Sequence, residues 1–148
     1  MTDMGVFRTT IGLENPARRG PIEEIAEALV DTGSEFTWVP ATVLASLGVT
    51  PERTQRFRLA DGRIVEREMG FAIVHAGGTT AVDHVVFGST TDLVLIGARC
   101  LEGLNLRVDP QRKQLVDAGP IVTAAANVNG NPPSEFHERT RILWLQFG

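Results

Sequence analysis

The sequence predicts a fold built mainly of β-strands, and three observations support this prediction. Residues 56–88 form a β-meander in which apolar and polar residues alternate between turns. An Asp-Gly pair at 61–62 is the strongest short-range hairpin signal, and a Gly-Gly pair at 77–78 marks a second hairpin. The fully apolar segment LVLIG at 93–97 predicts one more strand.

The region before the meander predicts two strands separated by a loop. Residues 5–13, GVFRTTIGL, alternate with the period of a strand. Residues 14–21 contain two prolines and a glycine, which predicts a loop. Residues 22–30, IEEIAEALV, are ambiguous. Their apolar positions have helical spacing, which favours a helix, but the segment ends in a continuous apolar run, which favours a strand. We expect a strand in the second half of this segment.

Two short helices and a last hairpin complete the expected elements. Residues 36–40, FTWVP, are rich in strand formers and end at a proline. Helix formers follow at 41–47, and Gly48 is a C-terminal stop signal. After the apolar strand, ARCLEGL at 98–104 suits one to two turns of helix. Residues 106–116 predict a strand, an Asp-Pro turn and a second strand.

The composition is that of an ordinary globular protein and argues against several classes of partner. Hydrophobic residues make up 43% of the chain and charged residues 22%. The formal net charge is -4 and no long basic run occurs, so we expect no nucleic-acid partner. No stretch approaches the ~20 apolar residues of a membrane span, and the N-terminus does not resemble a signal peptide. We therefore expect a soluble, cytoplasmic protein with no membrane partner.

The cysteine and the histidines suggest no metal or thiol chemistry. Cys100 is the single cysteine, so no intrachain disulfide can form, and a small buried hydrophobic role is expected for it. His75, His84 and His137 lie at no metal-ligand spacing. The sequence therefore predicts neither a metal site nor a cofactor.

The composition changes near residue 118 and indicates two regions. We expect a domain over residues 1–118. Residues 119–148 form a linker and tail, because they begin small, polar and proline-bearing. The tail ends in the apolar segment RILWLQFG, where Trp144 and Phe147 are expected to pack as part of a docked strand.

One short stretch, ALVDTGSEF at 28–36, carries the chemistry of interest. An apolar run stops at Asp31, and a hydroxyl residue, a glycine and another hydroxyl residue follow directly. One interpretation is an Asx-type surface turn after a strand, which is common. The other is a catalytic aspartate held at the end of a strand. The residues of this stretch alone leave both open.

The order of several motifs resembles the retropepsin-type aspartic proteases, in particular their single-lobed, retroviral-like bacterial and archaeal members. The motifs are LVDTGS, an ADG hairpin about thirty residues later, and VLIG followed by ARCLEGLNLRVDP. The resemblance covers roughly residues 4–117. It implies a single-lobed acid-protease fold, a closed β-barrel with one short helix after the LIG strand, and a homodimer.

The resemblance implies an aspartic endopeptidase that needs neither metal nor cofactor. Two aspartates would share one proton, so that one acts as a base on water while the other donates to the scissile carbonyl. This chain has one Asp-Thr-Gly, and the LIGA segment has no acid at the matching place. The second carboxylate would therefore be Asp31 of a second copy. The partners implied are that copy and a peptide or protein substrate.

The resemblance also implies roles for the neighbours of Asp31. Thr32 would bond across the dimer axis and lock the two loops together. Gly33 would let the backbone turn and approach the partner chain closely, and its N–H could point at the carboxylate. Ser34 would supply a further hydroxyl beside the pair of aspartates.

Two more segments would complete the site. The hairpin at Ala60, Asp61 and Gly62 would be the flap, which closes over bound substrate and excludes water. Ile96 and Gly97 would belong to the strand that supports the active-site loop, with Gly97 permitting close packing.

Three further charged residues lie near these segments in the sequence. Glu35 and Arg99 are candidates for a structural ion pair. Asp92 precedes the apolar strand and is expected to cap it or to pair locally.

A second hypothesis places the chain in a different class of protein. The fold could serve as a catalytically weak or inactive module for dimerisation or peptide binding that has kept the motif. The polar hairpin and the extra tail motivate this hypothesis. A tail that ends in RILWLQF could occupy the cleft as an extended strand and inhibit the protein.

Overall fold

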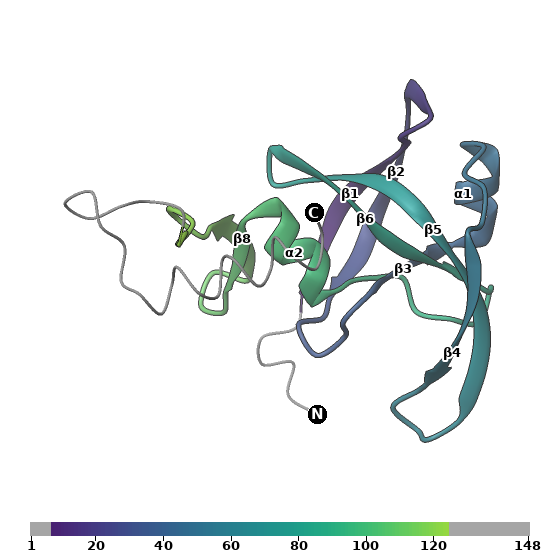
Figure 1. The fold of residues 1–148 in the computed structure, drawn as a ribbon. Helices are drawn as coiled ribbons and strands as arrows, with labels where there is room; N and C mark the ends of the chain where they lie inside the picture. The colour runs from purple at the N-terminus through teal and green to yellow at the C-terminus, as the bar shows by residue number, and fades with distance from the viewer. Residues whose placement is uncertain (1–6, 125–148) are drawn as a thin grey trace. The chain divides into compact units, whose positions relative to one another are not determined.

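A computed structural model of the chain describes residues 7–124 (Figure 1). This part of the chain contains nine strands and two short helices. The strands are β1 (Phe7–Asn15), β2 (Arg18–Val30), β3 (Thr37–Pro40), β4 (Arg53–Arg58), β5 (Ile64–Ala76), β6 (Thr79–Gly88), β7 (Leu95–Ile96), β8 (Leu106–Asp109) and β9 (Gln114–Asp117). The helices are α1 (Ala41–Ser46) and α2 (Ala98–Leu104), and both lie where the sequence predicts a helix. The predicted all-β class is confirmed.

Seven strands form one sheet that curls back on itself. Their order is β1-β2-β7-β3-β6-β5-β4, and β1 also pairs with β5, for example at Leu13↔Val74. Between β3 and β7 the ladder has a single residue pair, Trp38↔Leu95. We therefore describe a curled sheet and not the formally closed barrel that the resemblance implies. β8 and β9 form a separate two-stranded hairpin.

The prediction of a loop at 14–21 is wrong, because the pairing of β1 with β2 continues almost to the turn between them. β1 ends at Asn15 and β2 begins at Arg18, which leaves two residues between them. The pairing register shifts after Glu14, so residues 19–21 have no partner in β1 and the proline at 21 removes no ladder hydrogen bond. The ambiguous segment 22–30 is a strand throughout, so tertiary pairing overrides its helical spacing.

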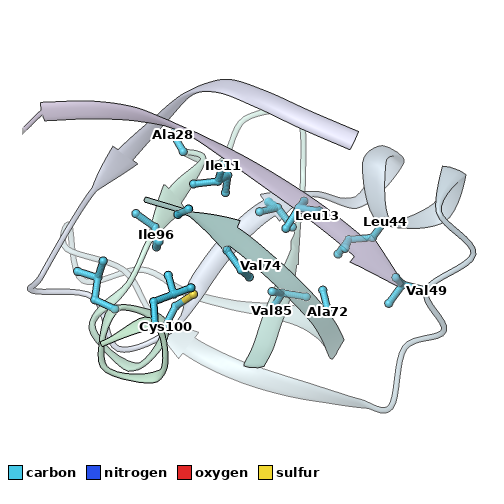
Figure 2. Close-up of a cluster of buried hydrophobic side chains, with 14 of the residues drawn as sticks. Ile11, Leu13, Ala28, Leu44, Val49, Ala72, Val74, Val85, Ile96 and Cys100 are labelled. Atoms are coloured by element: carbon cyan, nitrogen blue, oxygen red, sulfur yellow. The ribbon is translucent and has the colours of Figure 1, made fainter. Parts of the chain in front are cut away.

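The main core fills the inside of the curled sheet. Figure 2 shows it as a cluster of aliphatic side chains from the sheet and both helices. Its members include Ile11, Leu13, Val74 and Ile96, all fully or almost fully buried. Burying one such side chain contributes about 1.5–3 kcal/mol. Cys100 from α2 is also fully buried in this core, which confirms its predicted role as a small hydrophobe, and burial is the main reason that the pKa of its thiol is raised to about 12.

A second apolar cluster covers the opposite face of the sheet. Trp38 and Val39 are neighbours on β3, so their side chains point to opposite faces. Val39 joins the main core, whereas Trp38 packs with Met69 and Leu95 in the second cluster. This second cluster lies beneath the β4–β5 hairpin, because Phe57 of β4 packs against it.

The contacts divide the chain into two compact units after Ala118. Of the second unit the structure describes only residues 119–124, so the predicted packing of Trp144 and Phe147 lies outside the described residues. The assignment of residues 1–118 as a protease domain stays a prediction. In the described part of the chain, no helix has the length and apolar character to cross a membrane.

Candidate active site

Asp31 follows the last residue of β2 and is held there by the neighbouring strand. β2 and β7 run parallel, with Val30 opposite Ile96. The backbone N–H of Asp31 donates to the Ile96 carbonyl oxygen at 3.0 Å. Val30 and Ile96 are both buried in the main core. The Asp31 backbone is therefore fixed by a rigid, buried pair of strands.

The loop after Asp31 binds one oxygen of its carboxylate. The backbone N–H of Gly33 donates to Asp31 Oδ1 at 3.0 Å, and the N–H of Ser34 donates to the Asp31 carbonyl oxygen at 3.2 Å. The chain thus forms an Asx-type turn. Among the described residues Oδ2 has no hydrogen-bond partner. The turn and a reactive carboxylate are compatible, since the turn orients one oxygen and leaves the other accessible.

The start of α2 clamps this loop from behind. Ala98 and Arg99 donate their backbone N–H groups to the carbonyl oxygens of Ser34 and Glu35, at 2.7 and 3.1 Å. A Cβ added at Gly97 would overlap the Phe36 carbonyl group and lie 2.8 Å from the Ser34 carbonyl oxygen. Only glycine therefore fits between α2 and the loop without a shift of backbone.

Thr37 is part of the same support, and sequence reasoning missed it. Its side chain is buried, and its hydroxyl accepts a hydrogen bond from the Gly97 N–H at 3.0 Å. The sequence signal was a threonine on the buried face of a predicted strand, close after Asp31. Such a hydroxyl needs a polar partner in the core.

The ion pair expected between Glu35 and Arg99 is not formed within residues 7–124. The backbone N–H of Arg99 donates to the Glu35 carbonyl oxygen instead. The Arg99 guanidinium lies over the Phe36 ring, 5.4 Å from its centroid. The two residues are neighbours as predicted, but their contact runs through the backbone.

A cleft of about 700 Å³ separates the Asp31 loop from the β4–β5 hairpin. Its floor is apolar and includes Trp38, Phe57 and Leu95. The cleft brings together five of the predicted site residues, namely Asp31, Gly33, Ser34, Ala60 and Asp61, and its lining also includes Glu35 and Asp92. The carboxylate of the loop and the tip of the hairpin therefore face one space. Figure 1 shows the hairpin extending to one side of the sheet.

The remaining predicted site residues lie around the cleft and not in its lining. Ile96 and Gly97 support the loop from below, as described above. Gly62 completes the hairpin turn with a φ of 90°, a backbone conformation that favours glycine. Thr32 is exposed and lines a second hollow of about 470 Å³ between the loop and α2.

The tip of the β4–β5 hairpin is stabilised by its own hydrogen bonds. Gly62 donates its N–H to the Leu59 carbonyl oxygen at 2.9 Å, and the Leu59 N–H donates to the Arg63 carbonyl oxygen at 2.8 Å. The Asp61 carboxylate accepts the backbone N–H of Arg63 at 3.0 Å and its Nε–H at 2.8 Å. These bonds, with the backbone one first, hold the pKa of Asp61 below its usual range.

Asp92 forms both the local pairing that the sequence predicts and a distant one that it does not. Its Oδ2 accepts the Ser89 N–H at 2.7 Å, which is the expected local contact. Arg67 also donates to both oxygens of this carboxylate, from Nε to Oδ2 at 2.7 Å and from Nη2 to Oδ1 at 3.1 Å. The Arg67 hydrogen bonds are the main reason that the pKa of Asp92 lies below its usual range.

Comparison with known proteins identifies a family for most of this region. A family model described as aspartyl protease matches residues 20–98, more than half of the chain. The matched segment contains Asp31, the hairpin tip and Gly97. No curated protein matches the chain.

Proposed function

The chain belongs to the aspartyl protease family, of the retropepsin-like kind, and we propose that it is an aspartic endopeptidase whose site is completed by a second copy of the chain. One observation carries the proposal. The Asp31 carboxylate stands on a rigid strand pair at the edge of a large cleft, with one oxygen bound and the other without a partner among the described residues.

We propose a second copy because the other two aspartates in the cleft lining are already paired. Asp61 is bound to Arg63 in the hairpin tip, and Asp92 is bound to Arg67. An aspartate paired with arginine stays ionised and cannot hold the shared proton that the reaction requires. Asp31 of a second copy, related by a two-fold axis, supplies an equivalent carboxylate.

In the proposed reaction one Asp31 carboxylate acts as the base and the other acts as the acid. Like charges in close contact cannot both ionise, so one carboxyl keeps its proton. The ionised carboxylate takes a proton from water, and that water attacks the carbonyl carbon of the scissile peptide bond. The protonated carboxyl donates to the carbonyl oxygen. Collapse of the tetrahedral intermediate breaks the C–N bond, and the leaving amine takes up a proton from the pair.

The surroundings of Asp31 suit this reaction. Thr32 is exposed beside the second hollow, on a surface that a second copy could cover. The apolar floor of the cleft suits the side chains of an extended peptide. The β4–β5 hairpin stands over the cleft, where closure would exclude water from the reacting bond.

The first test is the variant Asp31→Asn. We expect it to fold, to dimerise, and to lose peptide cleavage by at least about 10³-fold in kcat, the scale of removing a catalytic group. Cleavage of a peptide library, with dimer mass measured in parallel, checks this. Asp109→Asn is the matched control, because Asp109 lies in the β8–β9 hairpin and an asparagine can still accept its turn hydrogen bonds. Cleavage by Asp31→Asn at the wild-type rate would show that Asp31 is not the catalyst.

Glu35 is the alternative partner acid for Asp31 within a single chain. It lines the same cleft as Asp31, and its carboxylate forms no ion pair among the described residues. If Glu35→Gln is as inactive as Asp31→Asn, the pair of acids lies within one chain. We expect Glu35→Gln to retain cleavage, because Asp31 of the second copy supplies the partner.

A further inference from the structure

The ion pair between Arg67 and Asp92 lies at the base of the β4–β5 hairpin. Arg67 is on β5, opposite Gln55 of β4, at the end of the hairpin away from the tip. Its guanidinium donates two hydrogen bonds to the Asp92 carboxylate, at 2.7 and 3.1 Å. Such a bidentate contact fixes the relative orientation of the two groups as well as their distance.

Asp92 joins this pair to the wall of the cleft. Its carboxylate accepts the Ser89 N–H, and its own N–H donates to the Ser89 carbonyl oxygen at 3.1 Å, so residues 89–92 form a tight turn. Thr91 and Leu93, on either side of Asp92, line the cleft. The side chain of Leu93 is 63% exposed, so it stands in the opening and can contact a bound ligand.

The same segment leads directly to the strand that holds Asp31. The Val94 carbonyl oxygen accepts the Leu29 N–H at 2.9 Å, and the Ile96 carbonyl oxygen accepts the Asp31 N–H at 3.0 Å. Arg67 is thus connected to the backbone of Asp31 through Asp92 and one short run of chain. The base of the hairpin is therefore linked through Asp92 and residues 93–96 both to the wall of the cleft and to the backbone of Asp31.

Burial distinguishes this pair from the ion pair at the hairpin tip. The Arg67 and Asp92 side chains are 21% and 9% exposed, whereas those of Arg63 and Asp61 are 70% and 56% exposed. The Arg67–Asp92 pair is partly buried, so removing one partner leaves a charge with less compensation from solvent, whereas an exposed pair contributes little. The base of the hairpin is therefore fixed to the body, while the tip is held by its own bonds.

We propose that Arg67 and Asp92 are positioning residues for peptide cleavage, which fix the hairpin base to segment 89–93 so that hairpin and segment close on the substrate as one unit. This inference rests on the proposed protease function. When the pair is broken, the hairpin and the segment must be ordered separately by each substrate. The fraction of molecules ready to bind falls, and KM rises in proportion. Asp31 keeps its own strand contacts, so kcat changes little.

The test measures full-length variants by steady-state peptide cleavage and by hydrogen exchange. We expect Arg67→Gln and Asp92→Asn each to raise KM about tenfold and to change kcat by less than about threefold. Exchange should accelerate in residues 64–68 and 89–93 and stay unchanged in β1 and β2. The double variant should be no worse than either single variant, because both remove the same contact. Arg112→Gln, which removes the exposed arginine of the Arg112–Asp109 pair at the β8–β9 turn, is the matched control and should change neither quantity.

Two results would overturn the proposal. One is a fall in kcat with KM unchanged. The other is faster exchange throughout the sheet with a lower melting temperature, which indicates a merely structural ion pair. If Arg67→Gln does not fold, Arg67→Lys keeps the charge, loses the bidentate geometry and carries the same test. If the wild-type chain cleaves no peptide, the protease proposal fails, and hydrogen exchange alone tests the connection between the hairpin base and segment 89–93. Faster exchange confined to residues 64–68 and 89–93 in Arg67→Gln supports this connection. Unaltered exchange in residues 89–93 contradicts it.

Discussion

The Glu14 carboxylate shows how much one buried charge depends on its neighbours. Only 4% of its side chain is exposed. It accepts hydrogen bonds from Arg19 Nε, from the Gly20 backbone N–H and from the His75 ring, each at 2.8 Å. These contacts, with the Arg19 bond the largest, lower the pKa of Glu14 from 4.5 to about 2. Glu14 thereby joins the β1–β2 turn to β5.

This shift predicts how stability depends on pH. A carboxylate with a lowered folded-state pKa stabilises the fold above its unfolded pKa, and the stabilisation is lost as pH falls through the folded pKa. The contribution of Glu14 should therefore be complete above about pH 4.5 and disappear toward pH 2. We expect Glu14→Gln to lower the free energy of unfolding at pH 7 and to flatten its fall between these values, measured by urea unfolding. Glu23→Gln, at an exposed site in β2, is the control. Equal pH slopes in wild type and Glu14→Gln would contradict this role.

The junction between α2 and the Asp31 loop depends on one residue without a side chain. A Cβ at Gly97 would overlap the Phe36 carbonyl group. We expect Gly97→Ala to lower the free energy of unfolding by about 1–3 kcal/mol or more, because a well-packed site cannot accept the extra carbon. Thermal unfolding checks this. Gly103→Ala, whose new Cβ would meet Ala81 Cβ at 3.3 Å, should change stability much less, and an equal effect of the two variants would refute the close-packing argument.

Elements with strong local signals were predictable from the sequence. The Asp-Gly and Gly-Gly turns, the apolar strand and α2 all lie where the pattern indicates, because turn chemistry and periodicity act over a few residues. The strand at 22–30 was ambiguous, because its partner in β1 decides its conformation and the segment itself does not. The loop predicted at 14–21 was wrong for the same reason.

Contacts that depend on the register of distant strands could not be predicted. Arg67 and Asp92 are 25 residues apart, and only the β5–β6 pairing and the turn after β6 bring them together. The buried hydroxyl of Thr37 likewise meets Gly97 across the sheet. In the candidate site, the motif around Asp31 and the hairpin tip could be named from the sequence. The groups that hold them in place required the structure.

The molecule as a whole presents half of the proposed active site. Within the described residues, the cleft contains Asp31 together with two aspartates that are paired with arginine. Membership of the aspartyl protease family supports a protease kind of activity. The shared proton of that chemistry requires a second carboxylate, and we propose that Asp31 of a second copy, related by a two-fold axis, supplies it. Activity should consequently fall more steeply than concentration on dilution.

Mixing wild-type chains with Asp31→Asn chains tests this central claim most directly. Peptide cleavage is measured at constant total concentration after the subunits have exchanged. If each site needs Asp31 from two chains, an equal mixture retains about a quarter of the wild-type activity, since every mixed dimer is inactive. If each chain acts alone, about half of the activity remains, and that linear decline would contradict a site shared between two copies.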